Sequence, residues 1–267
     1  MLSYQHIFHA GNLADVHKHA LLAWMLAYLT RKDKPLSYLE THSGRALYDL
    51  SAAAAVKTAE AAAGIEAVSD WFASDHPYAR VLGEVQAEFG ARHYAGSPML
   101  AARLLRPTDT MHLAELHPQE ASALRQAMRG TGAKVHVQDG FEMALSLAPP
   151  TPRRGMLLID PSYEIKTDYG LIPGVMGKIH KAWNVGVLAL WYPILTNGAH
   201  EPMLEALERR QMSAAFRHEV RFPPAREGHR MVGSGLFVIN APYGIEAEAA
   251  RLTERFAALK SRARHGV

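Results

Sequence analysis

Residues 156–163 read Met156-Leu157-Leu158-Ile159-Asp160-Pro161-Ser162-Tyr163 and carry the strongest structural signal in this 267-residue chain. Four apolar residues in a row have the length of a short strand, and an acid, a proline and an aromatic follow them closely. An unbroken apolar strand is typical of a parallel sheet that helices cover on both faces. We therefore expect an α/β fold with a functional loop that begins at Asp160.

Similar short apolar runs occur on both sides of this strand, and segments with helical spacing separate them. They cover residues 36–40, 111–115, 134–138 and 185–191. This alternation predicts a mostly parallel sheet. Two later runs, residues 214–220 and 235–240, predict a terminal antiparallel hairpin.

Three helical segments accompany the predicted strands. Residues 13–30 place apolar side chains at helical spacing behind Asn12, a suitable N-cap, and residues 245–264 repeat the amphipathic pattern with a basic end. Residues 52–92 are rich in alanine, glutamate and aromatics without a strand-like run, which predicts an insertion of two or three helices. The chain length suits one domain with such an insertion better than two domains in tandem.

The composition excludes several classes of chemistry. The chain has no cysteine, which rules out disulfides, thiolate metal sites, iron–sulfur clusters and a cysteine nucleophile. The formal net charge is only +3, so a site for a polyanion has to be a local patch. The longest apolar run, residues 20–29, is too short to span a bilayer or to act as a signal peptide. We expect a soluble cytoplasmic protein without a membrane association.

Each of four predicted strands ends on an acid. In an open parallel sheet, ligands bind outside the carboxyl ends of the strands, so Glu40, Glu115, Asp139 and Asp160 are expected around one pocket. Glu115 suits a ribose diol, because a carboxylate accepts two hydrogen bonds from neighbouring hydroxyls. Asp139, with Phe141 two residues later, suits an adenine ring, so the set predicts a cofactor that contains adenosine. The alternative is that loops carry polar residues simply because water reaches them.

The tetrapeptide Asp160-Pro161-Ser162-Tyr163 offers an acceptor, a fixed carbonyl and a stacking face within four residues. These are the groups that an amino group on a flat base needs. Hydrogen bonds from the amine to Asp160 and to the carbonyl of Pro161 would aim its lone pair at a methyl donor. The alternative is an ordinary strand-ending turn whose Tyr163 packs on the core.

The chain resembles the bacterial 23S ribosomal-RNA adenine-N6 methyltransferases of the RlmJ type along nearly its whole length. The matching motifs are Met1-Leu2-Ser3-Tyr4 with His6, Phe8-His9-Ala10-Gly11-Asn12, Ala14-Asp15-Val16, Lys18-His19, Thr41-His42 with Gly44, Gly96-Ser97-Pro98, Glu115-Leu116-His117-Pro118, Asp139-Gly140-Phe141, Asp160-Pro161 with Tyr163-Glu164, Lys166-Thr167-Asp168-Tyr169 and Leu190-Trp191-Tyr192-Pro193.

This resemblance implies a class I (Rossmann-like) methyltransferase domain over residues 1–267, with a small helical subdomain inserted at residues 50–93. It implies transfer of a methyl group from S-adenosyl-L-methionine to N6 of an adenine in 23S ribosomal RNA. The expected partner is that RNA before assembly, and no obligate protein partner is expected.

The resemblance also assigns residues to roles. The catalytic residues would be Asp160, Pro161 and Tyr163, and the substrate contacts would be Tyr4, His6 and Lys18. The cofactor would be held by His19, His42, Ser97, Glu115, Asp139, Gly140 and Asp160.

Two departures from the family pattern affect the pocket. The loop after the first strand has Glu40 where the family has an aspartate, and Arg45 follows the single Gly44, so backbone approach to the cofactor is less open. Ser162 replaces the second proline of the family's catalytic motif and relaxes the restriction on Pro161.

Three rival hypotheses remain. A metal site at Asp15, His17 and His19 is disfavoured because helical positions two apart point to opposing sides, and no metal is expected. A catalytically impaired RNA-binding protein on the same fold would not need acids around one pocket, because carboxylates repel phosphate. A DNA adenine-N6 methyltransferase usually carries a separate sequence-reading domain, for which the chain has no obvious room.

Overall fold

The computed structural model describes residues 5–225 and 228–265. Within them, seven strands form one sheet in the order β5-β4-β1-β6-β7-β9-β8. The strands are β1 (Ser37–Glu40), β4 (Thr110–Ala114), β5 (Lys134–His136), β6 (Gly155–Ile159), β7 (Val187–Leu195), β8 (Phe216–Arg221) and β9 (Met231–Ile239). The strands from β5 to β7 are parallel, and β9 runs antiparallel to both β7 and β8. The predicted α/β sheet with a terminal hairpin is confirmed.

The chain adds strands first on one side of β1 and then on the other, so the point at which the sheet changes its direction of growth lies between β1 and β6. After β1 the chain builds outward to β4 and β5, and it then returns to the other side of β1 to form β6 and β7. A crevice opens at such a switch point, outside the carboxyl ends of the two central strands. The end of β1 is Glu40 and the residue after β6 is Asp160, so both lie at this crevice.

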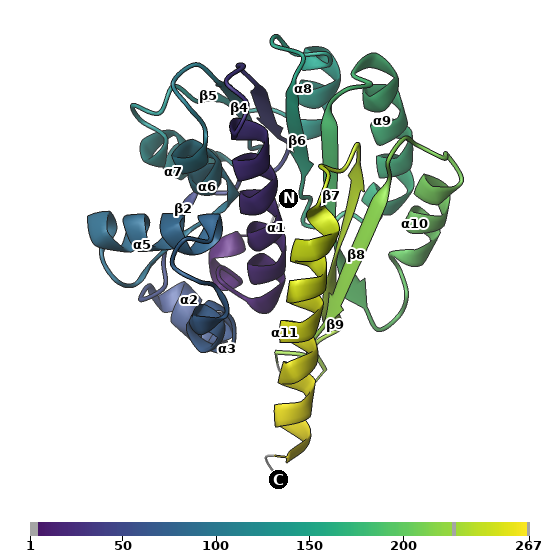
Figure 1. Cartoon of the computed structure of the whole chain (residues 1–267). Coiled ribbons are helices and arrows are strands. Elements are labelled where there is room, and N and C mark those ends of the chain that lie inside the picture. Colours follow the sequence, from purple (N-terminus) through teal and green to yellow (C-terminus); the bar gives the residue numbers. More distant parts are fainter. Residues whose placement is uncertain (1–4, 226–227, 266–267) are drawn as a thin grey trace.

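Helices cover both faces of the sheet, and the pleat divides the apolar side chains between them (Figure 1). Met156 and Leu158 point into the core beneath α1, whereas Leu157 and Ile159 point into the core beneath α9. This alternation within one apolar strand is the reason why β6 is buried on both faces, as the sequence predicted. The first face carries α1 (Leu13–Thr30), α6 (Ser97–Leu104), α7 (Pro118–Ala127) and α11 (Ile245–His265), and the second carries α8 (Gly140–Leu147), α9 (Asp168–Ala182) and α10 (Glu201–Glu208).

The helix α1 is buried almost all round, because it lies between the sheet, the inserted helices and α11 (Figure 1). Its N-cap is Asn12, whose side chain accepts a hydrogen bond from the backbone N–H of Asp15, as predicted. A 3-10 helix, η1 (His6–Phe8), precedes it. This arrangement delivers Asp15, Lys18 and His19 to the crevice.

The segment between β1 and β4 is more broken than the predicted two or three helices. It contains α2 (Ala53–Thr58), α3 (Glu60–Ala63), α4 (Ile65–Val68), the 3-10 helix η2 (Ser69–Trp71) and α5 (Pro77–Phe89). The chain breaks at Ala59, which has φ of 54°, and at Gly64, where a Cβ atom would lie 2.1 Å from the carbonyl oxygen of Gly11. Two strands that were not predicted, β2 (Leu47–Asp49) and β3 (His93–Ala95), pair antiparallel at the base of these helices.

Strands β7 and β9 extend beyond their predicted ends. They pair with each other from Leu188–Ile239 to Leu195–Met231, so each supplies the partner for the other's extension. The extension runs through Pro193 and Ser234, residues without a strong strand preference of their own. Tertiary pairing therefore set these boundaries.

We expect Gly155→Ala to destabilise the protein by about 3 kcal/mol or more, because the added Cβ would lie 1.9 Å from the backbone oxygen of Ser37 on β1. The matched control is Gly174→Ala within α9, where nothing lies within 4 Å of the added atom. That substitution should stabilise the protein by about 0.5 to 1 kcal/mol. Urea denaturation measures both, and equal stability of the two variants would contradict the close contact between β1 and β6.

Candidate active site

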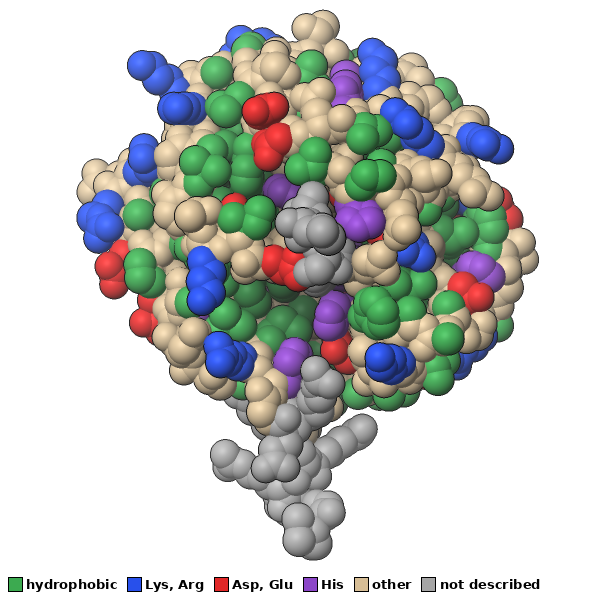
Figure 2. Space-filling model, turned by 180° about the vertical axis from the view of Figure 1, so that it is seen from behind, with side chains coloured by type: hydrophobic (Ala, Val, Ile, Leu, Met, Phe, Trp, Pro, Cys, Tyr) green, Lys and Arg blue, Asp and Glu red, His purple; other side chains and the backbone are tan. Residues whose placement is uncertain are grey.

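A pocket of about 450 Å³ lies at the carboxyl ends of the central strands, a volume that suits a small-molecule cofactor. Histidine and acidic side chains gather around a hollow on this face of the molecule (Figure 2). The pocket brings together nearly every residue that the sequence singled out. Among those that line it are His6, Lys18, His19, His42, Ser97, Glu115, Asp139, Gly140, Asp160, Pro161 and Tyr163. Tyr4 lies outside the described residues.

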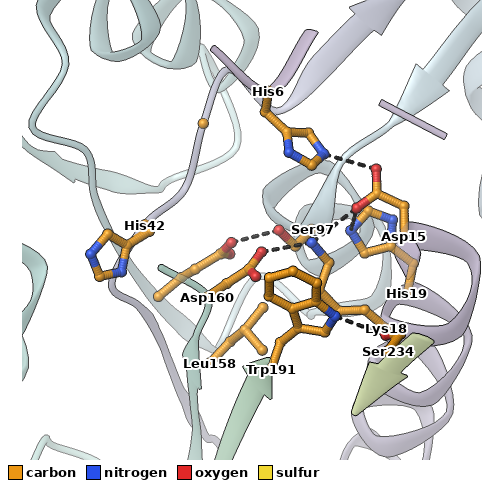
Figure 3. Close-up of polar contacts among 12 residues, drawn as sticks. His6, Asp15, Lys18, His19, His42, Ser97, Leu158, Asp160, Trp191 and Ser234 are labelled. Carbon is orange, nitrogen blue, oxygen red and sulfur yellow. Dashed lines mark hydrogen bonds and ion pairs between the residues drawn. The ribbon is translucent and has the colours of Figure 1, made fainter. Parts of the chain in front are cut away.

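Lys18 forms the charged centre of the pocket. Its Nζ atom lies 2.6 Å from Oδ2 of Asp160 and 3.0 Å from Oδ1 of Asp15, and its side chain is only about 4% exposed (Figure 3). Burial alone would lower the pKa of Lys18, but the two carboxylates outweigh it and raise the pKa above its usual value. Lys18 is therefore a fixed cation at physiological pH.

Asp15 anchors the other side of this cation. Its Oδ2 atom accepts hydrogen bonds from the backbone N–H of Gly11 at 3.0 Å and lies 2.8 Å from Nε2 of His6. Burial favours the neutral acid, but the hydrogen bond from His6 and the ammonium group of Lys18 outweigh it and hold the pKa of Asp15 well below its usual value. The carboxylate thereby joins the start of α1 to η1.

His19 is buried beside this centre. Its Nδ1 atom lies 2.7 Å from the hydroxyl of Tyr94, and burial lowers the pKa of His19 to about 3, so the ring is neutral. Its Nε2 atom has no hydrogen-bond partner among the described residues and lies 3.9 Å from Oδ1 of Asp15. Asp15 and His19 share one face of α1, whereas His17 points to Ser234 and His218 instead.

Glu40 differs from the other acids because it is fully buried and uncharged at neutral pH. It contacts the hydroxyl of Ser97 at 2.6 Å and that of Tyr38 at 2.8 Å. Burial raises the pKa of Glu40 to about 8, and the negative charge of Asp160 adds to this effect. Ser97, predicted as a cofactor contact, is therefore also the partner of the residue that replaces the family's aspartate.

Glu115 joins the loop after β4 to the loop after β1. Its two carboxylate oxygens accept hydrogen bonds from the backbone N–H groups of Gly44 at 2.8 Å and His117 at 2.7 Å. Each oxygen retains a lone pair for a ligand. Burial raises the pKa of Glu115 although both hydrogen bonds favour its charged form.

Asp139 and Gly140 form the start of α8. Asp139 caps this helix through a hydrogen bond from the backbone N–H of Glu142 to its Oδ1 atom. At Gly140 a Cβ atom would lie 1.8 Å from the carbonyl oxygen of Thr41, so the glycine lets α8 pack on the loop after β1. Beside them the ring of His42 makes an edge contact with Phe141, and burial lowers the pKa of His42 to about 4.

Tyr163 lies at the pocket wall in a constrained position. Its φ angle is 57°, its hydroxyl donates to the carbonyl oxygen of Trp191 at 2.7 Å, and its ring stacks on Tyr169 with centroids 4.6 Å apart. One face of the ring is thus already covered. Tyr163 therefore packs on the core and also lines the pocket, and its role as a stacking face for a base stays a prediction.

Several pocket residues were missed by the sequence reasoning. Asp15 had been considered only as a metal ligand, although its spacing of three from Lys18 on one helix signals an ion pair. Trp191, named from the sequence only within a family motif, lines the pocket, and Nζ of Lys18 lies 5.4 Å from its ring centroid. Within the described residues, no group of three or more histidines or acids is arranged to hold a metal ion, and no helix is both long and apolar enough to cross a membrane.

A comparison with protein families finds a match over most of the chain. Residues 33–263 match the family described as "Ribosomal RNA large subunit methyltransferase D, RlmJ". The chain belongs to this family. The resemblance stated from the sequence is confirmed, and with it the class I methyltransferase type of sheet.

Two curated relatives and one solved structure support the assignment. The ribosomal RNA large subunit methyltransferases J of Escherichia coli K12 and Haemophilus influenzae Rd are each 37% identical to the chain, over 93% of the chain and 90% of the relative. A crystal structure of a Legionella pneumophila protein is 35% identical, covers 94% of both chains and has a TM-score of 0.84.

The pocket's donor set fits S-adenosylmethionine. This methyl donor carries a sulfonium cation, a ribose diol and an adenine. Glu115, Asp139 and Asp160 line this pocket and supply carboxylate acceptors. A pocket with several acids suits a cationic ligand better than a phosphate.

The buried acid of this family member gives a prediction. Glu40 has a usual pKa of 4.5 and a folded-state pKa of about 8, so the folded protein holds an extra proton between these values. The free energy of unfolding therefore falls as pH rises through this window. Glu40→Gln has no such group to ionise, so its free energy of unfolding does not fall in this way. The free energy of unfolding of the variant minus that of wild type should therefore increase from pH 5 to pH 9 by on the order of a few kcal/mol.

The matched control is Glu60→Gln. Burial raises the pKa of Glu60, but hydrogen bonds from His9 and Asn12 outweigh it and lower the pKa. At pH values above the usual glutamate pKa of 4.5, the charge of Glu60 therefore stabilises the folded protein. Glu60→Gln should thus lower the free energy of unfolding at neutral pH. Urea denaturation at pH 5, 7 and 9 measures both variants, and a pH-independent difference for Glu40→Gln would refute a neutral Glu40.

Proposed function

We propose that the chain transfers a methyl group from S-adenosyl-L-methionine to the exocyclic N6 of an adenine in 23S ribosomal RNA. The observation that carries this proposal is the position of Asp160, which lines the pocket beside the buried Lys18. Its Oδ2 atom is held by Lys18 at 2.6 Å, and within the described residues nothing donates to Oδ1. Pro161 and Tyr163 follow it along the wall of the same pocket.

The proposed roles of the cofactor residues follow from their places in the pocket. Glu115 would accept the ribose hydroxyls, and the second oxygen of Asp139 would accept the adenine amine beside Phe141. The rest of the cofactor would be in contact with His19, His42, Ser97 and Gly140. Asp160 would lie near the methyl group. S-adenosylmethionine supplies a methyl group on sulfur, which is the electrophile of the transfer.

The proposed mechanism rests on alignment. The adenine leaves the RNA stack and enters the pocket, where Tyr163 supplies a stacking surface. The amine donates one hydrogen to Oδ1 of Asp160 and one to the carbonyl oxygen of Pro161, which turns the lone pair of nitrogen toward the methyl donor. Because Lys18 neutralises the charge of Asp160, the carboxylate acts as a placed acceptor at this stage.

The proposed partner is 23S ribosomal RNA before assembly, and the proposed location is the cytoplasm. Tyr4, His6 and Lys18 are the proposed substrate contacts. Lys18 is buried, so it reaches a substrate only inside the pocket, whereas His6 is partly exposed at its edge. We further propose that residues 50–93 form a helical subdomain inserted in the methyltransferase domain.

The first experiment incubates the protein with labelled S-adenosylmethionine and unmodified 23S ribosomal RNA, and then searches the nucleosides for N6-methyladenosine. The expected result is N6-methyladenosine in RNA and none in an adenine-containing DNA duplex. Methylation of the duplex alone would favour the DNA enzyme, a reading that the family assignment does not favour. Cofactor binding without transfer to either substrate would refute the proposed substrate.

We expect Asp160→Ala to reduce transfer by at least about a thousandfold while only weakening cofactor binding, because the amine loses its orienting acceptor. Asp160→Asn keeps the shape of the side chain and should be nearly as inactive. The control is Glu142→Ala, which removes an exposed carboxylate outside the pocket and should leave the rate unchanged. Near-normal turnover of Asp160→Ala, measured by single-turnover methyl transfer, would exclude the role proposed for Asp160.

A further inference from the structure

A line of hydrogen bonds, buried over most of its length, runs from Trp191 at the pocket to Thr253 on α11. The indole Nε1–H of Trp191 donates to Oγ of Ser234 at 2.9 Å, and Ser234 lies 2.8 Å from Nδ1 of His17 (Figure 3 shows the first link). Nε2 of His17 lies 2.9 Å from Nδ1 of His218, whose Nε2 atom lies 2.9 Å from the hydroxyl of Thr253. The line connects β7, β9, α1, β8 and α11 in turn.

The two ends of the line, together with neutral histidines, fix the direction of every hydrogen bond. An indole N–H can only donate, so the hydroxyl of Ser234 accepts from Trp191. At the other end the hydroxyl of Thr253 donates to a backbone carbonyl, that of Ala249, at 3.0 Å. It therefore accepts from the Nε2–H of His218. Burial lowers the pKa of both histidines and keeps them neutral, so Nδ1 of His218 accepts from the Nε2–H of His17 and Nδ1 of His17 accepts from the hydroxyl of Ser234.

Burial agrees with this neutral arrangement. His17 and Ser234 are fully buried and His218 is nearly so. Burial lowers the pKa of His17 well below its usual value, and the neighbouring His218 lowers it further. A polar line through a hydrophobic core is stabilising only when each member is satisfied, and it then holds its members in one geometry.

The residue at the pocket end of the line contacts the proposed catalytic groups from two sides. The ring of Trp191 lies beside Nζ of Lys18, which binds Asp160, and the backbone carbonyl of Trp191 accepts the hydroxyl of Tyr163. Trp191 lines the pocket, whereas Ser234 and His17 do not. The rotation of the indole about its side-chain bonds is set by its hydrogen bond to Ser234.

We infer that Ser234 and His17 are positioning residues that hold the indole of Trp191 as one wall of the pocket for the target adenine. This inference rests on the proposed function. Neither residue touches the pocket, so each acts only through Trp191. The other two members of the line are His218 on β8 and Thr253 on α11. Their hydrogen bonds fix the tautomer of His17.

The test compares Ser234→Ala with wild type by nuclear magnetic resonance of the indole N–H groups. The chain has four tryptophans, and the signal that disappears in Trp191→Phe belongs to Trp191. In Ser234→Ala we expect this signal to shift and its exchange with solvent to be about tenfold faster or more, since the hydrogen bond is lost. The signal of Trp183, whose N–H donates to the carbonyl of Arg153, should not move.

The kinetic half of the test uses the same variant. We expect the rate constant of methyl transfer to fall about tenfold or more, because the indole that positions the target adenine is no longer held in place. The dissociation constant for S-adenosylmethionine should stay within about twofold, because the cofactor contacts are unchanged. His17→Phe should show the same pattern, and Ser234→Thr, which keeps the hydroxyl, should restore both the signal and the rate.

The control is Ser37→Ala, which also removes a fully buried strand hydroxyl, one that donates to the carbonyl of Pro152. It should change stability without moving the Trp191 signal or the rate. An unchanged Trp191 signal in Ser234→Ala, or a shifted signal with a wild-type rate, overturns the inference. If wild type transfers no methyl group, the proposed function fails, and the Trp191 signal alone decides whether Ser234 positions the indole.

Discussion

The ion pair between Lys18 and Asp160 is the interaction on which the site depends. Two carboxylates, Asp15 and Asp160, lie close together away from water, and one buried ammonium group lies between them. Removing one member of such a group leaves an uncompensated buried charge, which is strongly destabilising. Since Lys18 lies on α1 and Asp160 follows β6, this contact also fixes the first helix against the centre of the sheet.

The sheet topology explains why these groups meet. Because the chain reverses its direction of sheet growth between β1 and β6, the loops after these strands diverge and leave a crevice. Two close backbone contacts then shape the crevice. Gly140 packs against Thr41, and Glu115 accepts the backbone N–H of Gly44, so three strand ends form one rigid rim.

The distribution of charge suits the proposed reaction. Glu40 is buried and neutral, Lys18 compensates the charge of Asp160, and Glu115 and Asp139 also line the pocket. A cationic methyl donor is attracted to such a pocket, whereas the phosphates of RNA are repelled from it. An adenine that has left the stack can enter without its backbone, and the neutral line through Ser234 and His17 adds no charge to the wall that would receive it.

The sequence by itself determined the elements with a local physical signature. The apolar run at residues 156–159, the cap at Asn12 and the acids after successive strands all follow from spacing between near neighbours. The strand and the cap appear where they were predicted, and Glu115, Asp139 and Asp160 line the pocket, whereas Glu40 is fully buried and is not among the lining residues. The partner of Lys18, the protonation of Glu40 and the line from Trp191 to α11 were decided only by the tertiary structure. Lys18 and Asp160 are separated by 142 residues, so no local period encodes their contact. Burial, which sets the charge of Glu40 and His17, exists only once the sheet and α1 have packed together.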